Sequence, residues 1–236
     1  VTEEYNFNDI YSTSFGMREF KAIGTQFEIN GKKVFLRGKH DGCVFPLTGY
    51  APMNIEEWYR ILKIAKQYGI NHYRFHSWCP PEAAFAAADM VGIYMHPELP
   101  YWDYATAFED DEQWNYFKKE VLRILKAYGN HPSFVMFAWG NELTVYLERM
   151  EELVEICRDK DSRHLYSIGS NNFFRNALMP KKADYWTTFW TEGKWNTEKC
   201  GFGGKHVRGS TPHNTRGHLE NASPSTVSPV SVSVAV

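Results

Sequence analysis

Hydrophobic and polar residues first alternate along the chain and then change to a repeating pattern of strands and helices. Between residues 27 and 36, two alternating runs flank Asn30 and Gly31, which predicts a β-hairpin with a two-residue turn. From Val34 onward, short apolar runs predict six further strands. They cover residues 34–37, 72–75, 93–98, 134–139, 165–169 and 185–189.

Helices with amphipathic spacing are predicted between these strands. Asn54 and Asp110 are residue types that cap helix N-termini, and each stands directly before an amphipathic run. Pro81 begins another helix, and Gly129 ends the longest one. The four predicted helices cover residues 55–67, 81–90, 110–128 and 147–158.

Strands that alternate with helices at this spacing predict an α/β fold with parallel βαβ units. A doubly wound sheet should show a glycine-rich phosphate loop after its first strand, but residues 38–42 are Gly-Lys-His-Asp-Gly. A (β/α)8 TIM barrel instead collects its site residues at the ends of many strands. Polar and aromatic residues do follow the predicted strands: Lys39, His40 and Asp41; Arg74, His76 and Trp78; Glu98 and Trp102; Asn141 and Glu142; Asn171 and Asn172; Trp190 and Glu192.

The barrel prediction is therefore favoured, although the strand count is short. Six strands are recognisable and a complete barrel needs eight, so we expect an incomplete barrel.

Composition narrows the classes of function. Hydrophobic residues make up 43% of the 236 residues, which is enough for a packed core. The net charge of −2 and pI near 6.5 argue against a nucleic-acid partner. Apolar runs are too short to span a membrane. The 4 cysteines lack zinc-ligand spacing, and nothing near His72 and His76 completes a metal set, so neither metal nor cofactor is expected.

The strongest chemical signal is the segment 130–142, a buried strand that ends in Gly140-Asn141-Glu142. The glycine allows close backbone approach, and two polar side chains follow where a ligand would lie. Glycoside hydrolysis needs a carboxylic acid to protonate the leaving oxygen, and a second carboxylate about 5–5.5 Å away if configuration is retained. Glu142 fits the first role, and its alternative is a helix-start carboxylate stabilised by the helix dipole.

Four segments together resemble the catalytic barrel of glycoside hydrolase family 2, the group of β-galactosidases, β-glucuronidases and β-mannosidases. They cover residues 27–38, 69–74, 92–98 and 130–142, in the order and at the spacing of that family. The resemblance implies a retaining exo-β-glycosidase that hydrolyses oligosaccharides or polysaccharide fragments by double displacement. Glu142 would be its acid/base residue, and the setting would be secreted or periplasmic.

The resemblance also implies roles for residues near Glu142. Asn141 would bind the sugar 2-hydroxyl, and Arg74 would help to hold the charge of the nucleophile. Family members usually continue with Ser-His-Tyr-Pro after that arginine and have Asn-x-His after the first strand, and this chain differs at both places. The remaining expected substrate contacts are His76, His40, Asp41, Glu98, Trp78 and Trp190.

Several of these residues could have a structural role instead of a role in substrate binding. Glu98 could instead be the ion-pair partner of Arg74. The tryptophans could stack on sugar rings, yet as a set they are more often part of a core. This applies to Trp78, Trp102, Trp139, Trp186 and Trp190.

The nucleophile is the main gap, because the resemblance places it after the seventh strand and fades near Ser210. Glu192 is the late substitute within the chain. The alternative function is therefore a carbohydrate-binding protein or an inactive remnant that lacks the nucleophile. An incomplete barrel would also leave strand edges uncovered, which favours self-association.

The expected domain organisation has three parts. Residues 1–26 form a lead-in from a preceding β module, residues 27–210 the partial barrel, and residues 211–236 an atypical tail without Phe, Trp or Tyr. The tail could be a disordered linker, an edge strand with alternating valines from Val230, or the product of a changed reading frame near Ser210. We favour the changed frame.

Overall fold

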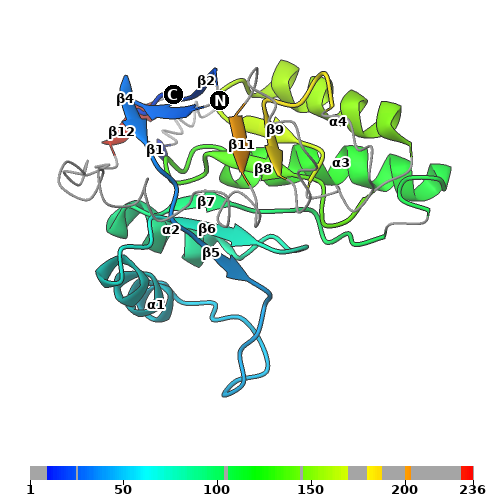
Figure 1. The fold of residues 1–236 in the computed structure, drawn as a ribbon. Helices are drawn as coiled ribbons and strands as arrows, with labels where there is room; N and C mark the ends of the chain where they lie inside the picture. Colours follow the sequence, from blue (N-terminus) through cyan, green and yellow to red (C-terminus); the bar gives the residue numbers. More distant parts are fainter. Residues whose placement is uncertain are drawn as a thin grey trace, which may run out of the picture.

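The computed structural model describes residues 10–24, 26–103, 106–143, 146–169, 180–187, 200–202 and 230–235. Parallel strands form its centre, and helices lie outside them (Figure 1). The strands are β5 (Gly38–Asp41), β6 (His72–Phe75), β7 (Tyr94–His96), β8 (Met136–Ala138), β9 (Leu165–Ser167), β10 (Tyr185–Thr187) and β11 (Cys200–Phe202). This is the α/β architecture of a TIM barrel, as the strand–helix alternation predicted.

Neighbouring strands pair in chain order. β5, β6 and β7 form one parallel ladder, β8 pairs with β9, and β10 pairs with β11. Parallel bridges join β7 to β8, and the Asp184 N–H donates to the Tyr166 carbonyl between β9 and β10. No pairing within the described ranges joins β5 to β11, so the barrel is incomplete there. The short strand β11 was not predicted from the sequence.

The four helices lie where the sequence predicted them, and two of them begin at the predicted capping residues. They are α1 (Ile55–Gln67), α2 (Glu82–Val91), α3 (Asp111–Tyr128) and α4 (Leu147–Lys160). The Asn54 side chain accepts the Glu57 N–H, and the Asp110 side chain accepts the Gln113 N–H. Each of these bonds satisfies a backbone donor that a helix N-terminus otherwise leaves unpaired.

The prediction of a first barrel strand over residues 34–37 is wrong. Val34 instead ends β4 (Lys32–Val34), which pairs with β3 (Gln26–Ile29). Residues 35–37 do not continue the strand. The Asn71 side chain bonds to their backbone, because it donates to the Phe35 carbonyl and accepts the Arg37 N–H. The first barrel strand, β5, therefore starts at Gly38, and residues 39–41 lie within it rather than after it.

A small antiparallel sheet packs against the N-terminal ends of the barrel strands. It consists of β2 (Phe20–Ile23), β3 and β4, and Asn30 and Gly31 form the predicted turn with positive φ angles of 50° and 72°. Its buried side chains form one apolar cluster with the first residues of several barrel strands. The cluster contains Phe20, Phe27, Ile29, Leu36, Tyr94, Val135, Met136 and Tyr185.

This sheet of β2, β3 and β4 therefore closes the barrel interior at the N-terminal ends of the strands, the bottom of the barrel. We call it the plug. The Phe20 and Phe27 rings stack at 5.6 Å, and the Phe27 ring meets the Tyr185 ring edge-on at 6.4 Å. The expected domain boundary between residues 26 and 27 falls inside this sheet.

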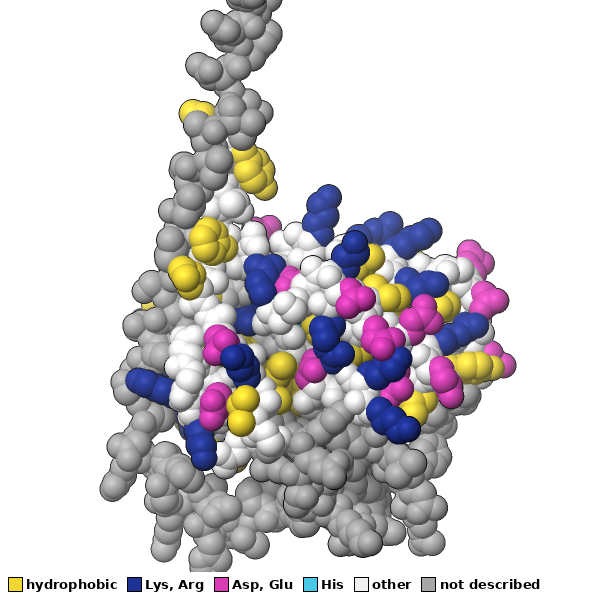
Figure 2. All heavy atoms as spheres, turned by 90° about the horizontal axis from the view of Figure 1, so that it is seen from above, with side chains coloured by type: hydrophobic (Ala, Val, Ile, Leu, Met, Phe, Trp, Pro, Cys, Tyr) yellow, Lys and Arg dark blue, Asp and Glu magenta, His cyan; other side chains and the backbone are white. Residues whose placement is uncertain are grey.

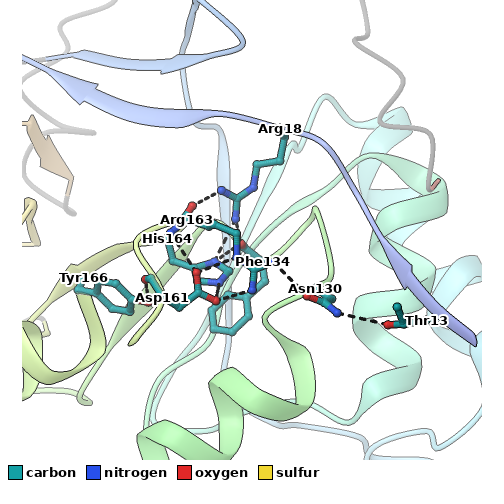
Figure 3. A network of polar contacts seen from close by, with 8 residues as sticks. All are labelled: Thr13, Arg18, Asn130, Phe134, Asp161, Arg163, His164 and Tyr166. Atoms are coloured by element: carbon teal, nitrogen blue, oxygen red, sulfur yellow. Dashed lines mark hydrogen bonds and ion pairs between the residues drawn. The ribbon is translucent and has the colours of Figure 1, made fainter. Parts of the chain in front are cut away.

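Arg18, in the segment between β1 (Ile10–Phe15) and β2, ties this region to loops that lie far along the chain (Figure 3). Its guanidinium donates to the carbonyl oxygens of Pro132, at 3.1 Å, Phe134 and Arg163. These carbonyls precede β8 and β9, at the end of the barrel opposite the carboxyl ends of the strands. One cation thus satisfies three backbone acceptors.

The partners of Arg18 are themselves held by a polar network (Figure 3). The Arg163 guanidinium donates to Asp161 at 2.5 Å and to the Asn130 side chain at 3.0 Å. Asn130 also donates to the Thr13 hydroxyl, just before Arg18. The lead-in segment is therefore anchored at several points to the bottom of the barrel.

Part of the tail is also described. Residues Val230–Ala235 form β12, which pairs antiparallel with β1, and this is the segment in which valines alternate with small residues. The changed reading frame near Ser210 stays a prediction, because residues 203–229 lie outside the described ranges.

One face of the molecule can be judged for its charge. On the face shown in Figure 2, basic and acidic side chains are interspersed and neither sign dominates. Within the described ranges, no helix combines the length and apolar character needed to cross a membrane.

Two histidines are completely buried in the barrel interior. His72 and His96 have no exposed surface, and their rings lie 5.6 Å apart. The Tyr185 hydroxyl lies 2.7 Å from His96 Nε2. Burial lowers the pKa of His72 to about 3, and it lowers the pKa of His96 well below the usual 6.5.

We predict that replacing Arg18 with alanine lowers the free energy of unfolding by about 2–4 kcal/mol, because three carbonyls lose a charged donor. The matched control is Lys21→Ala, which removes an exposed ion pair with Glu19 and should change stability by less than about 1 kcal/mol. Urea denaturation measures both. Equal effects of the two substitutions would contradict the anchoring role of Arg18.

We also predict that His72→Phe flattens the pH dependence of stability. Between pH 6.5 and about 3 the unfolded chain binds a proton at His72 and the folded chain does not. Stability due to this group therefore falls as pH drops through that window, by about 1.4 kcal/mol per pH unit. Urea denaturation at several values between pH 4.5 and 6.5 should show a shallower slope for the variant. An unchanged slope would disprove the prediction.

Candidate active site

Three side chains from neighbouring strands meet at the carboxyl ends of the barrel strands. Arg74, at the end of β6, donates through Nε to Glu98 Oε1 at 2.6 Å. Its Nη2 donates to Asn141 Oδ1 at 2.9 Å. Arg74 therefore links a residue just after β7 to a residue just after β8. The sequence placed all three residues near the site and offered Glu98 as a partner of Arg74, but it did not indicate the bond between Arg74 and Asn141.

Glu98 serves as the partner of Arg74, which is the second of its two expected roles. Its side chain is 1% exposed, and its second oxygen accepts the Ser77 N–H at 2.7 Å. Burial raises the pKa of Glu98, while Arg74 and the Ser77 N–H act in the opposite direction. In this structure one Glu98 oxygen is bonded to Arg74 and the other to the Ser77 N–H. The substrate contact expected of Glu98 stays a prediction.

Asn141 has a fixed orientation. Because Arg74 can only donate, the Asn141 atom facing it must be the carbonyl oxygen. The amide NH₂ group therefore points to the other side and can donate to a ligand. The backbone is fixed as well, since the Asn141 N–H donates to the Tyr101 carbonyl at 3.0 Å.

Gly140 is required by the close packing of three backbones. It has a φ of 141°, and a Cβ atom there would lie 2.0 Å from the Tyr101 carbonyl oxygen. A Cβ atom on Gly169, after β9, would in turn lie 2.2 Å from the Gly140 carbonyl oxygen. The glycine before Asn141 thus allows the ends of β7, β8 and β9 to approach closely.

Glu142 leaves the strand in a left-handed conformation, with a φ of 58°. Such a conformation costs roughly 1 kcal/mol or more for a residue with a side chain, and it is found at functional sites. Its Oε2 atom accepts the indole N–H of Trp102 at 2.9 Å, and its side chain is half-buried. Because α4 begins only at Leu147, the alternative role of a helix-start carboxylate does not apply.

His40 and His76 lie beside this group. Their rings are 4.6 Å apart, and the His76 ring meets the Trp102 ring at 4.9 Å and 85°. Burial, together with the charge of Arg74, lowers the pKa of both histidines. Neutral imidazoles can both donate and accept hydrogen bonds, which suits contacts with sugar hydroxyls.

Asp41 and Trp78 belong instead to the packing around the strand ends. The Asp41 carboxylate is bonded by Lys39 Nζ at 2.6 Å and by the Cys43 N–H at 3.1 Å. The Trp78 indole donates to the Asp41 carbonyl, and its ring packs against Phe75 at 5.2 Å. The substrate contacts expected of Asp41 and Trp78 stay predictions.

Four residues expected near the site lie outside the described ranges: Asn171, Asn172, Trp190 and Glu192. Their proposed roles stay predictions. Within the described ranges, no group of three or more His, Cys, Asp or Glu side chains is arranged to hold a metal ion.

Trp102 is the site residue that the sequence did not single out. It was one of five tryptophans that could contact a sugar, and its place just after a predicted strand was the signal that could have distinguished it. The contact with Glu142 joins residues 40 positions apart in the chain.

Comparison with known proteins shows the family of the chain. The family model described as "Glycosyl hydrolases family 2, TIM barrel domain" matches residues 20–189. A β-galactosidase of Thermoanaerobacterium thermosulfurigenes is 31% identical over 140 residues, covering 57% of this chain and 18% of that protein. A β-glucuronidase of Streptococcus agalactiae is 25% identical over 173 residues, covering 65% of this chain and 28% of that protein. The chain therefore spans less than a third of the length of these relatives.

Solved structures share the fold. A β-glucuronidase from an uncultured Clostridium superposes with a TM-score of 0.63 and 22% identity, covering 76% of this chain and 35% of that one. A β-galacturonidase from Eisenbergiella tayi, solved with galacturonate, gives a TM-score of 0.66 and 19% identity, covering 74% and 32%.

We predict that Gly140→Ala lowers the free energy of unfolding by about 2–4 kcal/mol, because its Cβ would collide with the Tyr101 carbonyl. The control is Gly42→Ala, where a Cβ meets nothing within 4 Å, and it should stay within about 0.5 kcal/mol of the unchanged chain. Thermal and urea denaturation report both. A neutral effect at Gly140 would show that the strand ends are not packed as described.

Proposed function

Because the chain belongs to family 2 of the glycosyl hydrolases, we propose that it carries the acid/base half of a retaining exo-β-glycosidase. The substrates are oligosaccharides or polysaccharide fragments, cleaved by double displacement. Glu142 protonates the departing glycosidic oxygen and later removes a proton from the attacking water. The observation that carries this proposal is the half-buried Glu142 carboxylate at the end of β8, held by one indole N–H.

The neighbours of Glu142 support this role. Asn141 directs its amide donors away from Arg74, so it can bind a sugar hydroxyl next to the bond that is cleaved. In the proposal this is the 2-hydroxyl, and His40 and His76 contact other hydroxyls. Arg74 supplies a guanidinium near the reaction centre, and Glu98 balances its charge.

The nucleophile is the second requirement. Retention needs a carboxylate about 5–5.5 Å from Glu142. Glu98 is unsuited, because both of its oxygens are bonded and buried. Glu192 remains the candidate within the chain, and it lies outside the described residues.

The second candidate function is a carbohydrate-binding protein that keeps the sugar contacts without a nucleophile. Incubation with 2-deoxy-2-fluoro β-glycosides separates the two functions. A covalent glycosyl adduct seen by mass spectrometry requires a nucleophile and supports the glycosidase. Binding of β-glycosides without an adduct or turnover supports the binding protein.

We predict that Glu142→Gln lowers kcat/KM for glycosides with poor leaving groups by about 10²- to 10⁴-fold, since general acid catalysis is lost. Aryl glycosides with good leaving groups should lose much less, because they need little protonation. The matched control is Glu148→Gln, an exposed glutamate in the first turn of α4, which should leave rates unchanged. Rates of hydrolysis for both substrate types measure this, and equal losses for the two would argue against Glu142 as the acid.

A further inference from the structure

Trp102 is a large aromatic side chain that is exposed although it contacts the candidate acid. Its relative exposure is 58%, while the tryptophans Trp58 and Trp139 in the core have none. A ligand that covers an exposed indole removes a large apolar area from water. This burial favours binding at that position.

The position of this side chain is fixed from both sides. The preceding residue, Tyr101, is buried, its hydroxyl donates to Gln113 at 2.6 Å, and that hydroxyl accepts the Phe108 N–H at 3.0 Å. The following residue, Asp103, accepts the Thr106 N–H at 3.0 Å. A binding surface held in this way loses little conformational entropy when a ligand arrives.

The ring plane is set by two contacts. The indole N–H donates to Glu142 Oε2, and the His76 ring packs against the indole at a steep angle. Because an indole nitrogen only donates, Oε2 acts as the acceptor, and Oε1 is left as the oxygen free to face the glycosidic oxygen.

This arrangement places Trp102 beside the leaving group. In the proposed reaction the Glu142 acid lies within hydrogen-bond distance of the glycosidic oxygen, and the leaving group is attached to that same oxygen. A side chain bonded to the other oxygen of this carboxyl group therefore borders the space that the leaving group occupies.

We propose that Trp102 forms a leaving-group subsite that binds a flat apolar face, either an aryl group or the C–H face of a second sugar. This inference rests on the proposed function, because it takes Glu142 as the acid. It goes further in naming the part of the substrate that is recognised outside the cleaved sugar, and the residue that recognises it.

The test compares ligands that differ only in the leaving group. Calorimetric titration of the whole chain uses methyl and phenyl β-D-galactopyranosides, methyl and phenyl β-D-glucuronides, and the disaccharide galactosyl-β-1,4-glucose. We expect the phenyl compound of the accepted sugar to bind about fivefold to tenfold more tightly than its methyl counterpart. A similar gain for the disaccharide identifies a sugar as the second source of the flat face, and a gain for phenyl alone identifies aryl groups.

Three variants assign the effect to one side chain. Trp102→Ala should abolish the gain and leave methyl glycoside binding within about twofold. Trp102→Phe keeps a flat ring and should retain most of the gain, which separates stacking from the bond to Glu142. The control is Tyr116→Ala, an exposed aromatic on α3 that should change nothing. Circular dichroism melting confirms that each variant is folded.

The outcomes separate this inference from the proposed function. If methyl glycosides bind but phenyl compounds bind no better, or if Trp102→Ala keeps the gain, the subsite is disproved and the proposed function stands. If none of these β-glycosides binds, both fail together.

Discussion

The buried ion pair between Arg74 and Glu98 is the constraint on which the candidate site depends. Removing a guanidinium and a carboxylate from water costs several kcal/mol for each ion, and the cost is recovered only with good geometry and further hydrogen bonds. Here Arg74 is 12% exposed and Glu98 1%, and Ser77 and Asn141 supply the further bonds. Any shift of one strand relative to the next would break this set, so the pair fixes the register of β6, β7 and the end of β8. The position of Asn141, and of Glu142 after it, follows from that register.

The two ends of the barrel are built from different chemistry. At the amino ends of the strands, Phe20 and Phe27 fill the interior with rings, and packing there contributes stability. At the carboxyl ends, polar groups such as Arg74 and Glu98 lie among the rings, and Gly140 and Glu142 adopt backbone conformations that are costly for most residues. The free-energy cost of the strained backbone at the carboxyl ends is offset by the apolar packing at the amino ends. Barrel enzymes commonly divide stability and function between the two ends in this way.

Features encoded by neighbouring residues could be predicted from the sequence. Asn54 and Asp110 mark their helices because a cap bonds to a backbone only three residues away. The same holds for the turn at Asn30 and Gly31. The first barrel strand was misplaced because an apolar run predicts extended backbone but does not specify which partner strand it joins, and here residue 34 joins the small sheet. The strand β11 was missed because three residues around a glycine carry almost no pattern.

Contacts between distant residues could not be predicted in this way. The family resemblance led to Glu142, yet no pattern in the sequence shows that the Trp102 indole bonds to it or that Arg74 joins Glu98 to Asn141. These contacts arise only when strands are placed side by side, which is a property of the fold rather than of a segment.

The anchoring of Arg18 also depends on contacts between distant residues, and it has a consequence for the order of folding. Its carbonyl acceptors lie 114, 116 and 145 residues further along the chain, so during synthesis the lead-in leaves the ribosome long before they exist. The contacts of Arg18 can form only after β8 and β9 have been synthesised. They are therefore a late step in an otherwise sequential assembly of βα units, and closing such a long loop has a large entropy cost.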